Sequence, residues 1–280
     1  MKMSHVRIGE FEILPIFDGT IASGLDKMPN AEDRLAAMSL IGAAPGVPIV
    51  MAVYGFLVKG SKSIALIDAG TGNKKGPGTG RLMTNLTAAG VSTGDIQRIY
   101  MTHWHADHFG GLTDDGGSAV FDKAEVVISQ SEARFWFESD IATMPARAQR
   151  ALTEARAAVA PYRERLRIVP DSGVCGDLIA VPSPGHTPGH TCWLLSGGEA
   201  SLLAWGDVVH IAPIHLARPS AAFEYDLDAD LAARTRRRIL EMAASERLLV
   251  AGAHLDAPGL SYIVKDGEGF RQRRWRDPAA

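Results

Sequence analysis

The sequence predicts a single α/β domain, spanning residues 1–280, in which two β-sheets are sandwiched between outer helices. Apolar, β-branched runs typical of strands alternate with segments of helical spacing along the whole chain. These segments form two halves of similar size, and no linker or block of charge separates them. A hydrophobic content of 46% over 280 residues is enough to bury a sizeable core without disulfides.

The chain is predicted to open with a meandering antiparallel sheet. Residues 5–16 and 53–67 are apolar and β-branched, and a Lys-Gly-Ser-Lys turn at 59–62 makes a hairpin of the second run. Between them, a short helix is expected over 30–40 and a Pro/Gly loop over 42–48.

A strand-then-helix pattern follows. Glycines mark 71–80 as a loop, and apolar residues at helical spacing predict a helix over 81–89, ended by Gly90. Strands are expected over 96–101 and 125–128, because both runs are short and apolar.

Two helices are expected next. The first covers 131–138 with Ser131 as its N-cap, and the second covers 144–160, which is rich in alanine and arginine and stops near Pro161.

The remaining chain returns to short strands within 166–205, followed by a helix over 227–244, a strand over 247–251 and an extended piece over 262–264. Two groups of arginines, one on this helix and one in the C-terminal tail, are expected to be solvated. They are Arg234, Arg236, Arg237 and Arg238, then Arg271, Arg273, Arg274 and Arg276.

Composition limits the partners. The net charge of −3 gives no reason to expect nucleic acid or an anionic membrane surface, so a small-molecule substrate is expected. Residues 1–10 lack the apolar stretch of a secretory signal, and no window resembles a membrane helix, which predicts a cytoplasmic protein. Cys175 and Cys192 are expected to be buried thiols.

The most informative motif is Thr-His-Trp-His-Ala-Asp-His at residues 102–108, directly after a predicted strand. His103 and His105 project from the same side of an extended chain, while the following loop turns Asp107 and His108 toward a neighbouring point. Imidazole and carboxylate donors at this density fit two adjacent metal ions better than one.

Further candidate ligands follow at later strand ends. His186 and His190 lie in a rigid Pro-Gly-His-Thr-Pro-Gly-His turn, Asp207 follows one apolar run, and His254 follows another. Taken singly, a histidine or aspartate in such a loop is more often a solvated residue or a turn cap than a metal ligand. Together they favour one shared metal site, in which the two oxygens of Asp207 are suited to bridging two cations.

In this order and at compatible separations, these motifs resemble the metallo-β-lactamase superfamily. The resemblance runs from the strand end at residues 67–70 to His254, and it implies an αββα sandwich of two mixed β-sheets flanked by helices. It implies one metal bound by His103, His105 and His186, a second bound by Asp107, His108 and His254, and Asp207 bridging the two. His190 is then expected to orient a ligand or close the turn, and Asp68 either to support a ligand or to be a solvated loop carboxylate.

The resemblance implies two divalent ions as cofactors. Zinc is the expected metal, and manganese, iron or cobalt suit the same donors. Two neighbouring ions lower the pKa of a shared water and present hydroxide to an electrophilic carbonyl or phosphoryl centre. Asp107 is expected to act in catalysis as well, by accepting the proton of the hydroxide. Similar enzymes often form dimers, so a homodimer fits the resemblance.

Within the superfamily, four segments resemble methyl parathion hydrolase and related lactone and aryl ester hydrolases. They are residues 76–82, 85–90, 204–210 and 254–259. The expected activity is therefore hydrolysis of lactones or activated aryl esters, with phosphotriesters as a side activity. The alternatives are an organophosphate hydrolase, a β-lactamase that uses Lys74 and Lys75 to hold the substrate carboxylate, and a non-catalytic or electron-transfer metal module.

Three residues are expected to shape substrate choice. His210 stands three positions after Asp207, where acyl-homoserine lactonases usually carry a tyrosine, so it departs from that pattern. It is expected either to contact a substrate oxygen or leaving group, or to be a structural histidine satisfied by the backbone. Similar enzymes line the leaving-group pocket with aromatic residues from the segment 135–137, so Trp136 is expected on the pocket wall, while Phe135 or Phe137 is expected in the core. Lys75 lies in a loop where related enzymes carry an aromatic residue, which argues against efficient binding of aryl organophosphates.

Overall fold

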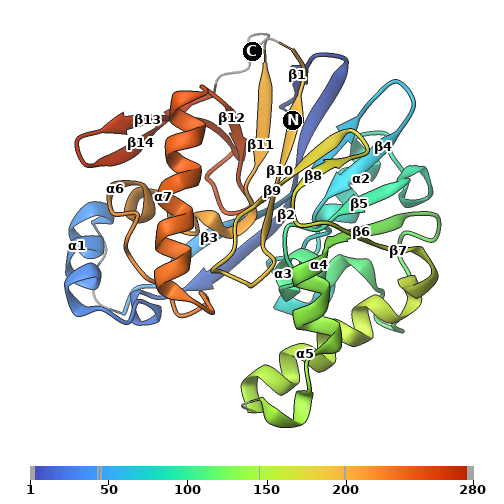
Figure 1. Cartoon of the computed structure of the whole chain (residues 1–280), viewed down its shortest axis with the longest axis horizontal. Coiled ribbons are helices and arrows are strands. Elements are labelled where there is room, and N and C mark those ends of the chain that lie inside the picture. Colours follow the sequence, from blue (N-terminus) through green and yellow to red (C-terminus); the bar gives the residue numbers. More distant parts are fainter. Residues whose placement is uncertain (1–3, 43, 45, 145, 199, 276–280) are drawn as a thin grey trace.

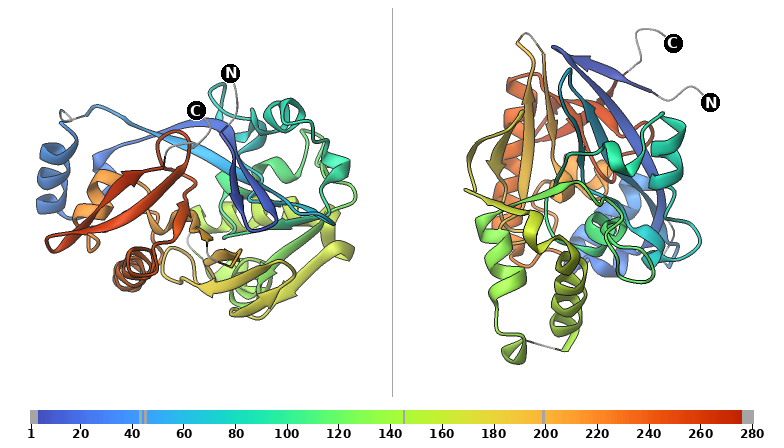
Figure 2. Two further views of the ribbon diagram at one scale, coloured as in Figure 1. Left: turned by 90° about the horizontal axis from the view of Figure 1, so that it is seen from above. Right: turned by 90° about the vertical axis from the view of Figure 1, so that its right-hand side faces the viewer.

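The computed structural model describes residues 4–42, 44, 46–144, 146–198 and 200–275, without the side chains of 74, 75 and 147. It confirms the predicted fold class: two mixed sheets pack against each other and helices lie outside them (Figures 1 and 2). In the part of the chain so described, no helix is both long and apolar enough to cross a membrane.

The first sheet holds seven strands that follow one another in chain order. They are β1 (Val6–Ile8), β2 (Phe11–Ser23), β3 (Ile49–Lys59), β4 (Ile64–Ile67), β5 (Arg98–Tyr100), β6 (Glu125–Ser129) and β7 (Leu166–Val169). Strands β1 to β4 pair antiparallel, whereas β4 to β7 pair parallel. Because parallel strands end at the same edge of a sheet, the residues that follow β4 and β5 meet there.

The second sheet also holds seven strands. In spatial order they are β14 (Gly269–Arg274), β13 (Leu260–Asp266), β12 (Leu249–Ala251), β11 (Ser201–Ala204), β10 (Thr191–Ser196), β9 (Leu178–Pro182) and β8 (Gly173–Cys175). Its parallel pair is β11 with β12. This pairing brings the segments that carry Asp207 and His254 to one edge.

Helices cover the outer faces of both sheets. They are α1 (Ala31–Ile41), α2 (Leu82–Ala88), α3 (Ala106–Phe109), α4 (Gln130–Ala133), α5 (Ala146–Val159), α6 (Ala212–Ala217) and α7 (Ala229–Ser245). A π-helical segment, Arg134–Glu138, continues α4. Short 3-10 turns lie at Leu25–Lys27, Gly72–Lys75, Thr93–Asp95, Gly110–Leu112, Ile141–Thr143, Ala160–Arg165 and Gly206–Val208. Figure 1 shows α7 along the second sheet and α5 projecting below the first.

Alternation along the strands explains the layers. In β11, Leu202 and Ala204 face the core between the sheets, whereas Leu203 faces the core under α6 and α7. In β4, Ile67 likewise faces the inter-sheet core and Leu66 the core under the helices of the first sheet. Side chains of a strand alternate between its two faces, so strands buried on both sides must be apolar throughout.

Several local expectations were wrong. Ser131 is not an N-cap: α4 begins one residue earlier, and both the amide and the hydroxyl of Ser131 donate to the carboxylate of Asp171. Residues 269–274 form strand β14 rather than a tail, with Arg271, Arg273 and Arg274 paired to β13, while Arg276 lies outside the described residues. Helix α6 was not predicted, because its six residues are too short for a helical period to stand out.

Candidate metal centre

Asp68 fixes the loop that carries the histidine cluster. It follows β4 with a left-handed backbone (φ 56°), and its carboxylate accepts hydrogen bonds from the amide and hydroxyl of Thr102, at 2.8 and 2.7 Å. The same carboxylate lies 2.8 Å from Nδ1 of His108. Donation by Nδ1 leaves Nε2 of His108 as the nitrogen that faces inward, so Asp68 supports a candidate ligand from a buried position and is not a solvated loop carboxylate.

One group of donors comes from the loop after β5, which carries His103 and His105, and from the turn at residues 184–190. Nδ1 of His105 lies 3.1 Å from Nε2 of His103 and 2.9 Å from Nε2 of His186. Together with a carboxylate oxygen of Asp207, these nitrogens lie within 4.8 Å of one another. Three imidazoles and one carboxylate at this spacing match the donors of a tetrahedral metal site.

A second group lies beside the first. It joins His108 and Asp107 to His254, whose Nε2 is 3.6 Å from Oδ2 of Asp107. Nδ1 of His254 lies 2.7 Å from the carbonyl oxygen of Ala52, to which it donates, so Nε2 is again the nitrogen that faces the group.

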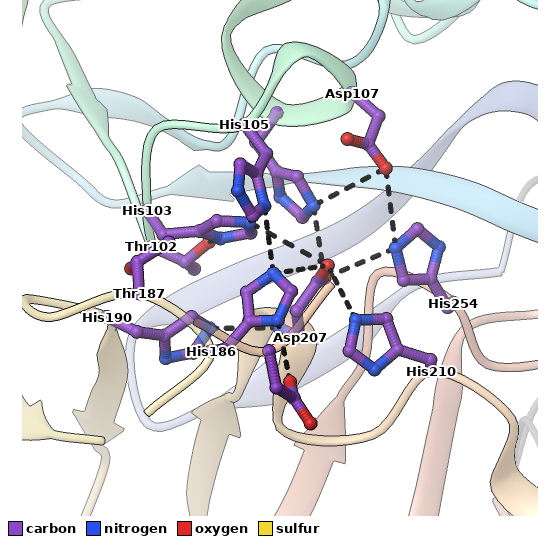
Figure 3. A network of polar contacts seen from close by, with 12 residues as sticks. Thr102, His103, His105, Asp107, His186, Thr187, His190, Asp207, His210 and His254 are labelled. Carbon is purple, nitrogen blue, oxygen red and sulfur yellow. Dashed lines mark hydrogen bonds and ion pairs between the residues drawn. The ribbon is translucent and has the colours of Figure 1, made fainter. Parts of the chain in front are cut away.

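Asp207 belongs to both groups and divides its oxygens between them. Oδ2 lies 3.3 Å from Nε2 of His186 and 3.7 Å from Nε2 of His103, whereas Oδ1 lies 3.0 Å from His108 and 3.2 Å from His254. Figure 3 shows Asp207 at the centre of the surrounding rings. The carboxylate therefore has the orientation needed to bridge two ions.

The backbone holds Asp207 in this place. Nε2 of His190 accepts a hydrogen bond from the Asp207 amide at 3.0 Å, and Nδ1 of His190 lies 2.7 Å from the Ser183 hydroxyl. The preceding Gly206 has φ 52°, and a Cβ there would stand 2.7 Å from His190. His190 thus contacts the backbone of Asp207, and a side chain at position 206 would displace the His190 ring.

The burial and protonation of the donor atoms in the two groups are those that a bound cation requires. Nε2 of His108 and Oδ1 of Asp207 are buried 3.0 Å apart, and neither has a further hydrogen-bond partner among the described residues. Burial, together with the charge of His186, lowers the pKa of His105 to about 3, so its imidazole is neutral and able to coordinate at neutral pH. Burial opposes ionisation of Asp207, but the surrounding histidines hold its pKa well below the usual range.

Glu132 connects the two ligand-bearing loops, and sequence reasoning missed it. Its buried carboxylate accepts from the Trp104 amide (2.8 Å), the Trp136 indole (2.6 Å), the Thr187 hydroxyl (2.7 Å) and the Gly189 amide (3.0 Å). Burial raises the pKa of this carboxyl, while the four donors act in the opposite direction. Its local sequence resembles that of a surface helix, so no pattern marked it.

Asp226 and Arg236 were also not predicted as site residues. Asp226 lies 2.9 Å from Nδ1 of His186, and its other oxygen accepts from Arg236 at 3.1 Å. Arg236 is only 1% exposed, which overturns the expectation that it is solvated. Its spacing from the buried residues Ala232, Ile239 and Leu240 gave a usable signal, because all four share one face of α7.

A cavity of about 860 Å³ opens beside both donor groups. Trp136 and His210, the two residues expected at a substrate pocket, both line it. Trp136 turns its N–H away to Glu132 and lies edge-on to His105, with ring centroids 5.5 Å apart. His210 is buried, and its Nε2 lies 3.3 Å from Oδ2 of Asp207. Among the described residues neither of its ring nitrogens bonds to the backbone, so it is not a structural histidine satisfied in that way. The side chain of Lys75 lies outside the described residues.

Comparison with known proteins agrees with this geometry. Residues 49–254 match the family described as the metallo-beta-lactamase superfamily. The chain is 27% identical over 128 residues to a probable metallo-hydrolase of Mycobacterium tuberculosis, a match that covers 43% of this chain and 39% of that protein.

Two solved structures resemble the whole chain. One is the hydrolase AbOPH of the beta-lactamase superfamily, with a TM-score of 0.90, 27% identity and coverage of 98% of each chain. The other is AidC, a dizinc quorum-quenching lactonase in complex with an acyl-homoserine product, with a TM-score of 0.89, 26% identity and coverage of 98% of this chain and 97% of AidC.

Proposed function

Because the chain belongs to the metallo-β-lactamase superfamily, we propose that it is a dinuclear metal-dependent hydrolase of lactones or activated aryl esters. The observation that carries the proposal is the divided carboxylate of Asp207, with one oxygen toward each donor group. One ion is assigned to His103, His105 and His186, the other to Asp107, His108 and His254, with Asp207 shared.

Zinc is the proposed metal. Three imidazoles with a carboxylate suit it, and AidC is described as a dizinc enzyme. When bound, two such ions supply Lewis-acid activation of a shared water and of the attacked substrate oxygen.

The chain's own residues supply positioning and proton transfer. Asp107 is the group proposed to accept the proton of the attacking water, because its side chain is 14% exposed and lines the cavity. His210 is proposed to hydrogen-bond a substrate oxygen, because it lines the cavity, its Nε2 lies 3.3 Å from the Asp207 carboxylate, and no described backbone group bonds to its ring. Trp136 offers an apolar edge to the substrate.

The cavity lining favours uncharged substrates. Apart from Asp107 and Asp207, which are assigned to the ions, its charged side chains among those described are the carboxylates Glu154 and Glu224, and no described lysine or arginine lines it. Such a lining suits a lactone, an ester or a phosphotriester better than the carboxylate of a β-lactam. A phosphotriester hydrolase is the second candidate, because a neutral phosphotriester meets the same lining and the same proposed ions.

A substrate panel tests the proposal. After zinc, cobalt or manganese reconstitution, turnover of dihydrocoumarin, an acyl-homoserine lactone, methyl paraoxon and nitrocefin is compared. We expect the lactones to be hydrolysed fastest, Asp207→Ala to be inactive, and Asp230→Ala on the exposed side of α7 to match the wild type. Absence of turnover on every lactone and ester would refute the lactonase assignment.

A further inference from the structure

We infer that Asp226 and Arg236 act as a positioning pair that orients His186 and fastens the cavity wall to the candidate metal centre. The inference rests on the proposed function, because it assigns these residues a role toward the ion held by His103, His105 and His186.

Asp226 fixes the orientation of the His186 ring. Oδ1 of Asp226 accepts from Nδ1 of His186 at 2.9 Å, and the Asp226 side chain is fully buried. A proton fixed on Nδ1 leaves the lone pair of Nε2 directed at the donor group. A carboxylate behind a ligand imidazole also raises its basicity, which strengthens binding to a metal.

The guanidinium of Arg236 balances the buried negative charge of Asp226. A buried carboxylate is costly unless it is paired, and Nη2 of Arg236 donates to Oδ2 of Asp226 at 3.1 Å. Asp226 therefore faces His186 with one oxygen and the guanidinium of Arg236 with the other.

The guanidinium of Arg236 also donates hydrogen bonds to three backbone carbonyl groups from other segments. Nε of Arg236 donates to the carbonyl of Val208 at 2.6 Å, and Nη1 donates to the carbonyls of Pro219 and Ala221, both at 2.9 Å. Val208 directly follows the bridging Asp207. One side chain on α7 therefore joins the segment of Asp207, the loop after α6 and the partner of His186.

The pair formed by Asp226 and Arg236 is also connected to the cavity wall. Tyr225 and Leu227, on either side of Asp226, both line the cavity. The Leu227 amide donates to the carbonyl of His186 at 3.1 Å, and the Asp228 amide donates to that of Gly185 at 2.9 Å. The wall segment and the ligand turn thus lie side by side, so a disturbance of the pair reaches both metal affinity and substrate fit.

Arginine is required here in preference to lysine. The planar guanidinium satisfies four acceptors in fixed directions, whereas an ammonium group has three donors at one point. Arg237, the next residue on the helix, is exposed and serves as the matched control.

The experiment measures the two metal dissociation constants by chelator competition, without substrate, for the wild type, Asp226→Asn, Arg236→Lys and the control Arg237→Lys. Asp226→Asn keeps the shape but removes the charge, and we expect one of the two constants to weaken 10–100-fold while the other changes less than threefold. Arg236→Lys should weaken the same constant by a smaller factor. It should also raise KM at least fivefold with kcat changed less than threefold, because the walls at Tyr225 and Leu227 loosen.

Three results would overturn the inference: both constants unchanged in Asp226→Asn, both weakened equally, or Arg237→Lys behaving as Arg236→Lys does. If Asp226→Asn fails to fold, Arg236→Lys decides by the same selective loss at one site. A wild type that binds two ions but hydrolyses no lactone or ester refutes the proposed activity and leaves this inference standing. A wild type that binds no metal refutes both.

Discussion

Replacing Glu132 with glutamine tests whether one buried carboxylate joins the two loops that carry the candidate ligands. The carboxylate oxygens accept four hydrogen bonds, two from tryptophan N–H groups and two from Thr187 and Gly189. Glutamine has one acceptor oxygen. With that oxygen kept on the Trp104 and Trp136 side, its NH₂ group faces the Thr187 hydroxyl, which can rotate to accept, and the Gly189 amide, which cannot.

The magnitude follows from this count. One buried N–H without an acceptor costs about 1–3 kcal/mol, and loss of the charge from the remaining bonds adds about 1 kcal/mol. We therefore expect Glu132→Gln to lose about 3 kcal/mol of unfolding free energy. For a chain of 280 residues this corresponds to a fall in Tm of about 6 °C.

The assay is thermal unfolding of the chelator-stripped protein, so that metal binding does not contribute. Glu138→Gln is the matched control, because Glu138 is exposed and lies on the π-helical segment that continues α4. Its Tm should stay within about 1 °C of the wild type, as expected for a surface change of less than about 0.5 kcal/mol. A Tm for Glu132→Gln that equals that of the control would refute the reasoning.

Other substitutions and reagents test separate parts of the account. His210→Leu should change the ranking of lactone, ester and phosphotriester substrates and leave two metal ions bound, measured by the substrate panel and metal analysis; loss of an ion would mean that His210 is a ligand. Burial raises the pKa of Cys192 to about 12 and also raises that of Cys175, so thiolate is disfavoured at both. With a pKa near 12, about one Cys192 in 10⁴ is ionised at pH 8, and a thiol reagent should label neither cysteine before unfolding and both after it. Rapid labelling of the native protein would contradict their burial.

The candidate ligands could be predicted because the residues next to them in the sequence form recognisable patterns. His103, His105 and His108 stand close together in sequence, and Asp207 and His254 each follow a short apolar strand. The parallel pairing of β4 with β5 and of β11 with β12 turns this local pattern into a shared location. The position of the candidate ligands after predicted strands therefore allowed both the fold class and the site to be predicted from the sequence.

The supporting residues were not predictable in the same way. Glu132 and Asp226 are buried because partners from distant segments satisfy them, and a single sequence does not reveal those partners. Arg236 was misjudged because a run of arginines suggests a solvated surface, although its helical spacing with Ile239 and Leu240 indicated the core. The expected homodimer, cytoplasmic location and single domain stay predictions.

The central claim is that two metal ions, held on either side of Asp207, are needed for hydrolysis. Its most direct test is a zinc titration of the chelator-stripped protein in which bound zinc and the rate of lactone hydrolysis are measured together. We predict that each chain binds two zinc ions and that the rate of hydrolysis reaches its maximum only at the second equivalent. Full activity at one equivalent, or a rate that does not follow bound metal, would contradict it.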